Sequence, residues 1–360
     1  MELDHKNAPI LGGYFVIRKI YFKWMETPLL YCRFGKKRPS FIFSVLVSVL
    51  GYFSIGAAVA AYPDKPIKVI VPFAPGGGTD LVARTLSVPM GEDLRQAIVI
   101  DNKPGGSTVI GTDALAKSPP DGYTLVVATL AHAVNPSLKT KLPYSQDRDF
   151  APIILVGVSP NIVVVSENSP YKNFAEFLAA AKANPGKLSY ASQGGGTSAH
   201  LAGELFNSMA GTKLTHVPYK GAGPALTDVI GGQVDVMFAT ASAVGSLVEA
   251  GKLRALAVTT PVRSTTPALS KLPTVSESGV PGYSAGSWYG YIAPAGTPSQ
   301  VIAKLNASIK KGVQTPAFKS RVESEGLIIK TGSPEDFAKF LKLEELRWRT
   351  VIKDANITPD

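Results

Sequence analysis

The sequence predicts an α/β fold of two lobes, each a central, mostly parallel sheet flanked by helices. Strand-like and helix-like patterns alternate from residue 67 to about residue 258, which is typical of parallel sheets with crossover helices. The strands are near-continuous apolar runs, such as 69–71 and 162–165, as expected where both faces of a sheet are covered. In addition, a strand that ends in a glycine-rich turn before a helix occurs twice, about 120 residues apart.

The two glycine turns begin similar series of elements. In the first series, the apolar run 68–73 leads into Gly76-Gly77-Gly78-Thr79, and a helical pattern begins at Asp80. In the second series, residues 188–192 lead into Gly194-Gly-Gly-Thr-Ser198 and another helical pattern. Each series then continues as strand, glycine turn, helix and a closing strand that ends in Ala-Thr. We interpret the two series as a degenerate internal duplication of a β-α-β-α-β unit, with convergence as the alternative.

A glycine turn followed by a helix N-terminus is a suitable anion site, because the first backbone N–H groups of a helix have no partner within it. Such a terminus stabilises an anion by about 0.3–1 kcal/mol when exposed and up to ~2 kcal/mol when partly buried. Two such turns therefore predict two lobes that close on one acidic ligand. Its carboxylate is expected to accept N–H bonds from Gly76, Gly77, Gly195 and Gly196, assisted by the hydroxyls of Thr79, Thr197 and Ser198.

Residues 1–61 have the composition of a secretory signal. A basic cluster at 33–38 precedes an apolar stretch at 41–56, and Ala57-Ala-Val-Ala-Ala61 offers small-residue cleavage sites. The alternative is a retained membrane anchor, since residues 41–61 are long enough to span a bilayer. Either Met1 or Met25 is the start of translation. Cleavage would place the remainder of the chain in the periplasm.

Composition excludes several classes of function for the remainder. Residues 1–61 hold eight of the 37 Lys and Arg and three of the 27 Asp and Glu, so half of the net charge of +10 lies there. The other charges are scattered, without a basic run, and nucleic-acid binding is not expected. The single cysteine, Cys32, precedes the apolar stretch, so the exported chain has no disulfide or thiol.

The last third of the chain completes the first lobe. A strand is expected at 287–294, a helix at 299–312, and a final helix from Ser333, with Pro334 in its first turn, to about Val351. Linker-like stretches at 166–170 and 263–283 are expected to cross between the lobes. The predicted division is 62–163 plus 284–360 for lobe 1 and 164–283 for lobe 2.

An ordered set of short motifs resembles one known family. The motifs are Pro72-Phe-Ala-Pro-Gly-Gly-Gly-Thr-Asp80, Ala83-Arg84, Lys141-Leu-Pro-Tyr144, Asp149-Phe-Ala-Pro-Ile153, Val217-Pro-Tyr-Lys-Gly221, Gly231-Gly-Gln-Val-Asp235, Ala250-Gly-Lys-Leu-Arg-Ala-Leu-Ala-Val258 and Trp288-Tyr-Gly. Together they resemble the Bug family, periplasmic substrate-binding proteins of tripartite tricarboxylate transporters. The resemblance covers residues 62–359, with the motifs in order.

The resemblance implies a Venus-flytrap protein without enzymatic activity or cofactor, a monomer that closes on a carboxylated solute and delivers it to two integral-membrane subunits. Di- and tricarboxylates and aromatic carboxylates all fit. Many family members carry Asp or Asn just after Met-Phe, where this chain has Ala239-Thr240-Ala241. A side-chain acceptor for an ammonium is therefore missing, which makes an amino-bearing ligand less expected. Carried over by motif, the ligand-binding residues are Phe73, Ala74, Gly76, Gly77, Thr79 and Asp80 in lobe 1, Ser192, Gly195, Gly196, Thr197 and Ser198 in lobe 2, and Thr129, His132 and Thr240 at the flanks.

Several other interpretations remain open. Asp80 is more easily explained as an anchor for its own turn than as a contact of an anion. Residues 194–199 match a dinucleotide-binding pattern, but no acidic residue ends the next strand, so nucleotide binding is not expected. His132, His200 and His216 lack metal-ligand spacing. A ligand-sensing receptor would have the same sequence features, whereas a carboxylate-processing enzyme is disfavoured because no nucleophile–base pair or metal cluster is apparent.

Overall fold

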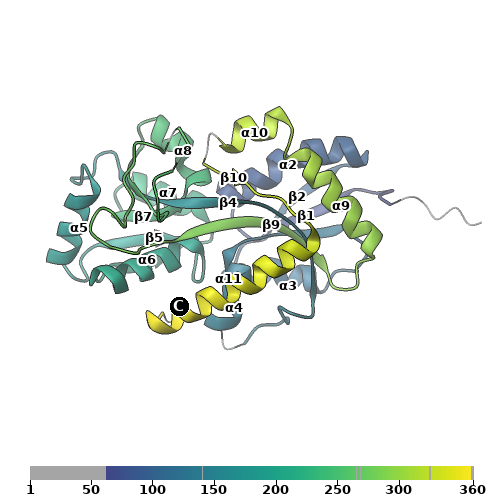
Figure 1. The fold of residues 1–360 in the computed structure, drawn as a ribbon, viewed down its shortest axis with the longest axis horizontal. Helices are drawn as coiled ribbons and strands as arrows, with labels where there is room; N and C mark the ends of the chain where they lie inside the picture. The colour runs from purple at the N-terminus through teal and green to yellow at the C-terminus, as the bar shows by residue number, and fades with distance from the viewer. Residues whose placement is uncertain (1–61, 140, 265, 268, 324–325, 358–360) are drawn as a thin grey trace, which may run out of the picture. The chain divides into compact units, whose positions relative to one another are not determined.

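The computed structural model describes residues 62–139, 141–264, 266–267, 269–323 and 326–357, all of which belong to one compact unit (Figure 1). The predicted signal at 1–61 lies outside the described residues. The described strands follow the order β2-β1-β3-β9-β4-β7-β5-β6, and β10 and β8 both pair with β4 off this path. Their bounds are β1 Ile67–Val71, β2 Ile98–Asn102, β3 Thr124–Ala128, β4 Phe150–Ser166, β5 Ser189–Ser192, β6 Thr215–Pro218, β7 Val236–Thr240, β8 Leu253–Val258, β9 Gly286–Pro294 and β10 Ile328–Ile329.

Helices cover both faces of the strands. Their bounds are α2 Gly78–Leu94, α3 Val109–Ala116, α4 Leu130–Leu138, α5 Phe174–Ala183, α6 Ser198–Ala210, α7 Ala222–Ile230, α8 Ala241–Glu249, α9 Ser299–Gly312, α10 Pro316–Glu323 and α11 Pro334–Asp354. The last helix begins with a full capping box, in which Ser333 and Asp336 each accept an N–H from the other's backbone. The α/β class predicted from the alternating patterns is confirmed.

The sheet is mixed, because two long strands run against their neighbours. β1 pairs in parallel with β2 and β3, and β5 with β6 and β7. β9 is antiparallel to β3 and β4, and β4 is antiparallel to β7 and β8. Both parallel sets are the strands of the two series that the sequence analysis identified; beyond them, the described residues have an isolated parallel bridge between Val258 and Thr274.

The passage between the two sets of strands lies inside β4. Its residues Phe150 to Pro160 pair with β9, and from Asn161 onward it pairs with β7 and, from Ile162, with β8. Residues 166–170, which we expected to form a crossing, come after that passage, so their predicted role as the crossing is wrong. A continuous strand needs no Pro- or Ser-rich linker. A search for linker-like composition therefore placed the passage at the wrong residues.

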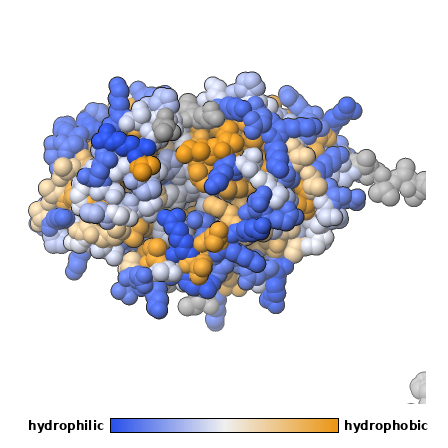
Figure 2. Space-filling view, viewed as in Figure 1, coloured by the Kyte–Doolittle hydropathy of each residue, from blue (hydrophilic) through white to orange (hydrophobic). Residues whose placement is uncertain are grey.

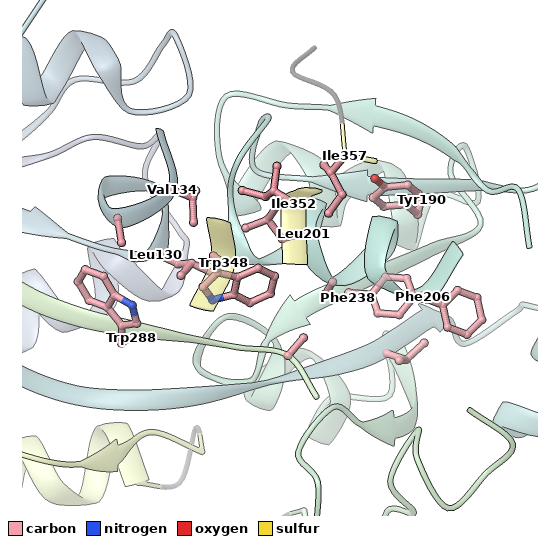
Figure 3. Packing of buried hydrophobic residues seen from close by; sticks show 14 of the residues in the cluster. Leu130, Val134, Tyr190, Leu201, Phe206, Phe238, Trp288, Trp348, Ile352 and Ile357 are labelled. Atoms are coloured by element: carbon pink, nitrogen blue, oxygen red, sulfur yellow. The ribbon is translucent and has the colours of Figure 1, made fainter. Parts of the chain in front are cut away.

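Successive side chains of a strand point to opposite faces of the sheet, and this alternation separates the hydrophobic clusters. Ile67, Val69 and Val71 of β1 belong to the cluster that α2, α9 and α10 cover, while Ile70 faces α3 and α4 on the other side. The latter cluster continues under α5, α6 and α11, and Figure 3 shows Trp348 and Ile352 of α11 among residues of α4, α6 and β9. A third cluster lies between α7, α8 and the second set of strands.

Within the described part of the chain, we find no helix with both the length and the apolar character that crossing a bilayer requires.

Candidate functional site

The N-cap residues of four helices line one small cavity, which Ala222, the first residue of α7, also lines. These N-cap residues are Gly77 for α2, Thr129 for α4, Thr197 for α6 and Thr240 for α8. In none of the four does the side chain of the N-cap residue accept a hydrogen bond from the backbone of its helix. The full lining is Phe73, Gly77, Gly78, Thr79, Thr129, Gln193, Thr197, Ser198, Ala222, Thr240, Ser287 and Tyr289, around a volume of about 30 Å³.

The helix termini make this cavity electropositive without a charged side chain. Every lining residue is neutral. Each helix contributes roughly half a positive charge at its N-terminus, carried by N–H groups that have no partner inside the helix. A cavity with this arrangement favours an anion, whose charge is met by backbone dipoles instead of Lys or Arg.

The first glycine turn presents the start of α2 to the cavity. The first intrahelical bond runs from the Leu81 N–H to the Gly77 carbonyl, over 2.9 Å. The N–H groups of Gly78, Thr79 and Asp80 have no acceptor among the described residues. Gly76 has a φ of +90°, a left-handed conformation that only glycine adopts without strain. The turn therefore requires glycine at 76, while the available donors lie two to four residues later.

The carboxylate of Asp80 is the anchor of this turn. It accepts hydrogen bonds from the Gly76 N–H at 3.2 Å, from Arg84 Nε at 2.9 Å and from Asn102 Nδ2 at 3.0 Å. Burial opposes its ionisation, but these donors outweigh burial and hold the pKa of the Asp80 carboxyl below its ordinary value. Asp80 is thus a neutralised anion that fixes the turn, as the sequence analysis favoured, and it uses the Gly76 N–H that we had assigned to the ligand.

The second glycine turn repeats this arrangement with a different side chain. The Gly196 N–H donates to Nδ1 of His200 over 3.0 Å, again four residues later, and α6 begins at Ser198. The Thr197 hydroxyl donates to the Gly194 carbonyl at 2.7 Å. The N–H groups of Ser198 and Ala199 have no acceptor among the described residues. Ser198 is thus the residue of this turn whose N–H and hydroxyl both remain available at the cavity.

Ser192 stabilises the second glycine turn through its hydroxyl group. Its hydroxyl accepts the Gly194 N–H at 3.0 Å and lies 2.6 Å from Nε2 of His216. The sequence analysis found no nucleophile–base pair, yet this serine and this histidine do meet. Ser192 is completely buried and does not line the cavity, so the pair supports the turn instead of facing a substrate.

The other side of the cavity comes from strand ends and from β9. Thr129 directly follows β3 and Thr240 ends β7, which places both at the carboxyl edge of parallel strands. Tyr289 of β9 meets Ser242 of α8 through their hydroxyl oxygens, 2.8 Å apart. A Cβ on Gly78 would lie 2.3 Å from the Tyr289 hydroxyl oxygen. Glycine at 78 is therefore required for the start of α2 to approach this tyrosine.

Seven of the fourteen predicted site residues line the cavity. These are Phe73, Gly77, Thr79, Thr129, Thr197, Ser198 and Thr240. The others do not line it. Gly76, Asp80, Ser192 and Gly196 make hydrogen bonds within the two turns, Gly195 belongs to the second turn, and the Ala74 N–H donates to the Lys220 carbonyl. A bond from the first turn to the segment before α7 brings the two series into direct contact.

His132 lies in a different place. It is 3% exposed, packs edge-on against Phe150 with ring centroids 5.1 Å apart, and lines a separate cavity. Our prediction that it flanks the same pocket as the glycine turns is not met, because the third residue of α4 points away from the helix terminus that faces the cavity. Burial lowers the pKa of His132 to about 3, so its imidazole is neutral.

Sequence reasoning missed five residues that line the cavity. Gly78 was within the quoted turn, but which glycine faces the cavity depends on where the helix begins. Gln193 precedes the second turn, and its Oε1 is buried without a hydrogen-bond partner. Ala222, Ser287 and Tyr289 come from elements far along the chain. Tyr289 belongs to the Trp288-Tyr-Gly motif, but no local pattern marks any of the three as a site residue. Within the described ranges no three His, Cys, Asp or Glu side chains are grouped as a metal site requires.

Residues 82–357 match the model of the tripartite tricarboxylate transporter family receptor. The chain belongs to this family. Among its curated relatives is protein BugT of Bordetella pertussis (strain Tohama I), which is 36% identical over 317 residues, covering 86% of this chain and 97% of BugT.

Two solved structures with similar sequences have a similar fold. R. palustris Rpa4515, determined with adipate, has 36% sequence identity and a TM-score of 0.80, over 83% of this chain and all of that one. MatC from Rhodopseudomonas palustris, determined with bound malate, has 32% identity and a TM-score of 0.77, over 81% of this chain and all of that one.

Proposed function

We propose that this family member is an exported receptor that binds a small organic carboxylate where its four helix N-termini meet. It then passes the ligand to the membrane subunits of a tripartite transporter. The observation that carries the proposal is the convergence of the N-caps of α2, α4, α6 and α8 on one neutral cavity. Adipate and malate in the two related structures are ligands of the corresponding chemistry.

Binding requires the cavity to open. Its 30 Å³ admits about two water molecules, at the 10–15 Å³ that one water needs, and a dicarboxylate of four or more carbons is larger. The walls are held together by backbone contacts between the two series, such as the bond from the Ala74 N–H to the Lys220 carbonyl. Opening would break these contacts while β4 and β9 bend near Pro160 and Gly286, where their pairing ends. The predicted lobe boundary at 163/164 lies close to this place.

Export and release from the membrane complete the proposal. Cleavage after residue 61 would free the chain in the periplasm, as is usual for receptors that serve a membrane transporter. The ligand should leave unchanged, since the described lining offers donors, dipoles and hydroxyls but no side chain that could act as a base to activate them. Recovery of an altered acid after incubation with the protein would instead indicate an enzyme.

Two hydroxyls offer the most direct test. Thr79 and Ser198 line the cavity from opposite turns, and neither hydroxyl makes a hydrogen bond within the described residues. We expect the double variant Thr79→Ala/Ser198→Ala to bind its dicarboxylate at least about tenfold more weakly, which corresponds to ~1.4 kcal/mol. Isothermal titration with malate and adipate measures this change.

The matched control is Ser320→Ala, on an exposed position of α10 away from the cavity. It removes a hydroxyl of the same kind and should leave the affinity as it is. Equal affinities of all three proteins would refute the assignment of the site. No binding of any carboxylate by the unsubstituted protein would refute the function.

A further inference from the structure

A second cavity lies between α4, the start of β4, β9 and α11, away from the four helix termini. Its volume is about 160 Å³. It is lined by His132, Ala133, Gln146, Asp147, Phe150, Pro152, Ile292, Ala338, Leu341, Lys342 and Glu345. Figure 1 shows α4 and α11, the two helices that form its sides, next to each other. None of these residues lines the first cavity.

The inner wall of this cavity is apolar and aromatic. Phe150 is flanked edge-on by His132, with centroids 5.1 Å apart, and by Tyr144, at 5.3 Å. Ile292 and Leu341 complete the apolar surface. An engineered apolar cavity of about 150 Å³ holds one benzene molecule, so a single six-membered ring matches this volume. Such a ring could make further edge-to-face contacts with the aromatic cluster of His132, Tyr144 and Phe150.

Two buried polar atoms at the wall have no hydrogen-bond partner. They are Nδ1 of His132 and Oε1 of Gln146. His132 is 97% buried, and its imidazole is neutral because burial lowers its pKa to about 3. A buried polar atom left unpaired costs about 1–3 kcal/mol, so a ligand that supplies a partner recovers that energy. A hydroxyl both donates and accepts, and it therefore suits either tautomer of the imidazole.

The charged side chains of the cavity do not create an anion site. Asp147 and Lys342 are exposed and of opposite sign, and Glu345 is paired with Arg349. A carboxylate placed inside would face the lone pairs of Gln146 and the neutral imidazole, without a cation at the inner end. This cavity thus differs in chemistry from the first, which favours an anion.

We propose that the cavity between α4 and α11 is a second binding site, for a small neutral aromatic alcohol such as phenol. The ring lies against Phe150 and Leu341, and the hydroxyl bonds His132 and Gln146. This inference is independent of the carboxylate site and of transport.

Phenol and toluene are the probes for this site. The purified protein, labelled at the methyl groups of Ala, Ile and Leu, is titrated with each compound and followed by NMR. Phenol should shift the methyl signals of Ala133, Ile292, Ala338 and Leu341. His132→Leu keeps an apolar wall but removes the acceptor, so phenol should bind about fivefold more weakly while toluene changes by less than about twofold.

Two further variants keep the test decisive if His132→Leu folds poorly. Ala338→Leu adds side-chain volume at the cavity and should abolish binding of both probes, whereas Lys342→Ala at the exposed rim should change neither affinity. The proposal is overturned if phenol shifts methyl signals elsewhere, if Ala338→Leu still binds it, or if only water occupies the cavity in crystals grown with phenol.

Discussion

At the scale of single residues, two different side chains perform the same task in the two glycine turns. The Gly76 N–H is held by Asp80 and the Gly196 N–H by His200, in each case four residues later. An acid near an anion site is tolerable in the first turn because Arg84 balances its charge and Asn102 donates a hydrogen bond to it. In both turns the glycine donor is used internally, and the N–H groups that remain for a ligand are those of Gly78, Thr79 and Asp80 in the first turn and of Ser198 and Ala199 in the second.

His132 should determine part of the sensitivity to acid. Its pKa in the folded protein is about 3, below the ordinary value of 6.5, so the unfolded chain binds a proton that the folded chain does not. The stabilising effect of its neutral form is complete above pH 6.5 and is lost as the pH falls toward 3. Between pH 6.5 and 5 the free energy of unfolding should decrease by about 2 kcal/mol from this residue.

Urea unfolding at pH 7, 6 and 5 measures that slope, and His132→Phe should flatten it. The matched substitution His216→Phe removes another histidine and tests whether the effect belongs to His132. A slope that His132→Phe leaves as steep as before would show that this residue is not buried in neutral form.

At the scale of elements, close packing limits which residues the helices after the turns can contain. α6 crosses directly over β5, and a Cβ on its Gly203 would lie 2.4 Å from the ring of Tyr190. The hydroxyl of that tyrosine donates to Glu204 of the same helix at 2.6 Å. Glycine thus allows the helix that carries Ser198 to lie close to the sheet.

Gly203→Ala should therefore destabilise the protein although alanine favours helices. The steric conflict costs about 1–3 kcal/mol, against a gain of up to ~1 kcal/mol from helix propensity. Thermal unfolding is the measurement. Gly231→Ala is the control, since its Cβ would approach no atom closer than 3.4 Å. A melting temperature of Gly203→Ala equal to or above that of the unsubstituted protein would contradict this packing.

How much of the site the sequence predicts also depends on the element. The order of strand, glycine turn and helix located Gly77, Thr79, Thr197 and Ser198, because these features follow one another in the chain. Thr129 and Thr240 were found from the similar ends of two strands. Tyr289 could not be found in this way, since β9 joins β3 and β4 only through long-range pairing. The crossing inside β4 was missed for the same reason: apolar patterning continues through it.

At the scale of the whole molecule, charge selects the ligand. Four helix termini favour an anion, and no carboxylate lines the cavity to balance an ammonium group. Malate and aspartate have the same carbon skeleton and differ in a hydroxyl or an ammonium group. We expect aspartate to bind at least about tenfold more weakly, a difference of ~1.4 kcal/mol.

Competition between the two acids in isothermal titration measures this preference, with succinate as the reference that lacks both groups. Aspartate that binds as tightly as malate would indicate an acceptor outside the described lining.

The surface seen in Figure 2 is mainly hydrophilic, with apolar side chains over β10 and the middle of α11, where Ile328, Leu343 and Leu346 are exposed.

The single long strand β4 also links the stability of the two halves. Its first part belongs to the sheet that contains β9, and its last part to the sheet that contains β7 and β8. Both halves thus share one unbroken segment of backbone as a central strand. Local melting that spreads past Pro160 and Asn161 removes a partner strand on both sides, so the pairing on either side of this point helps to protect the other.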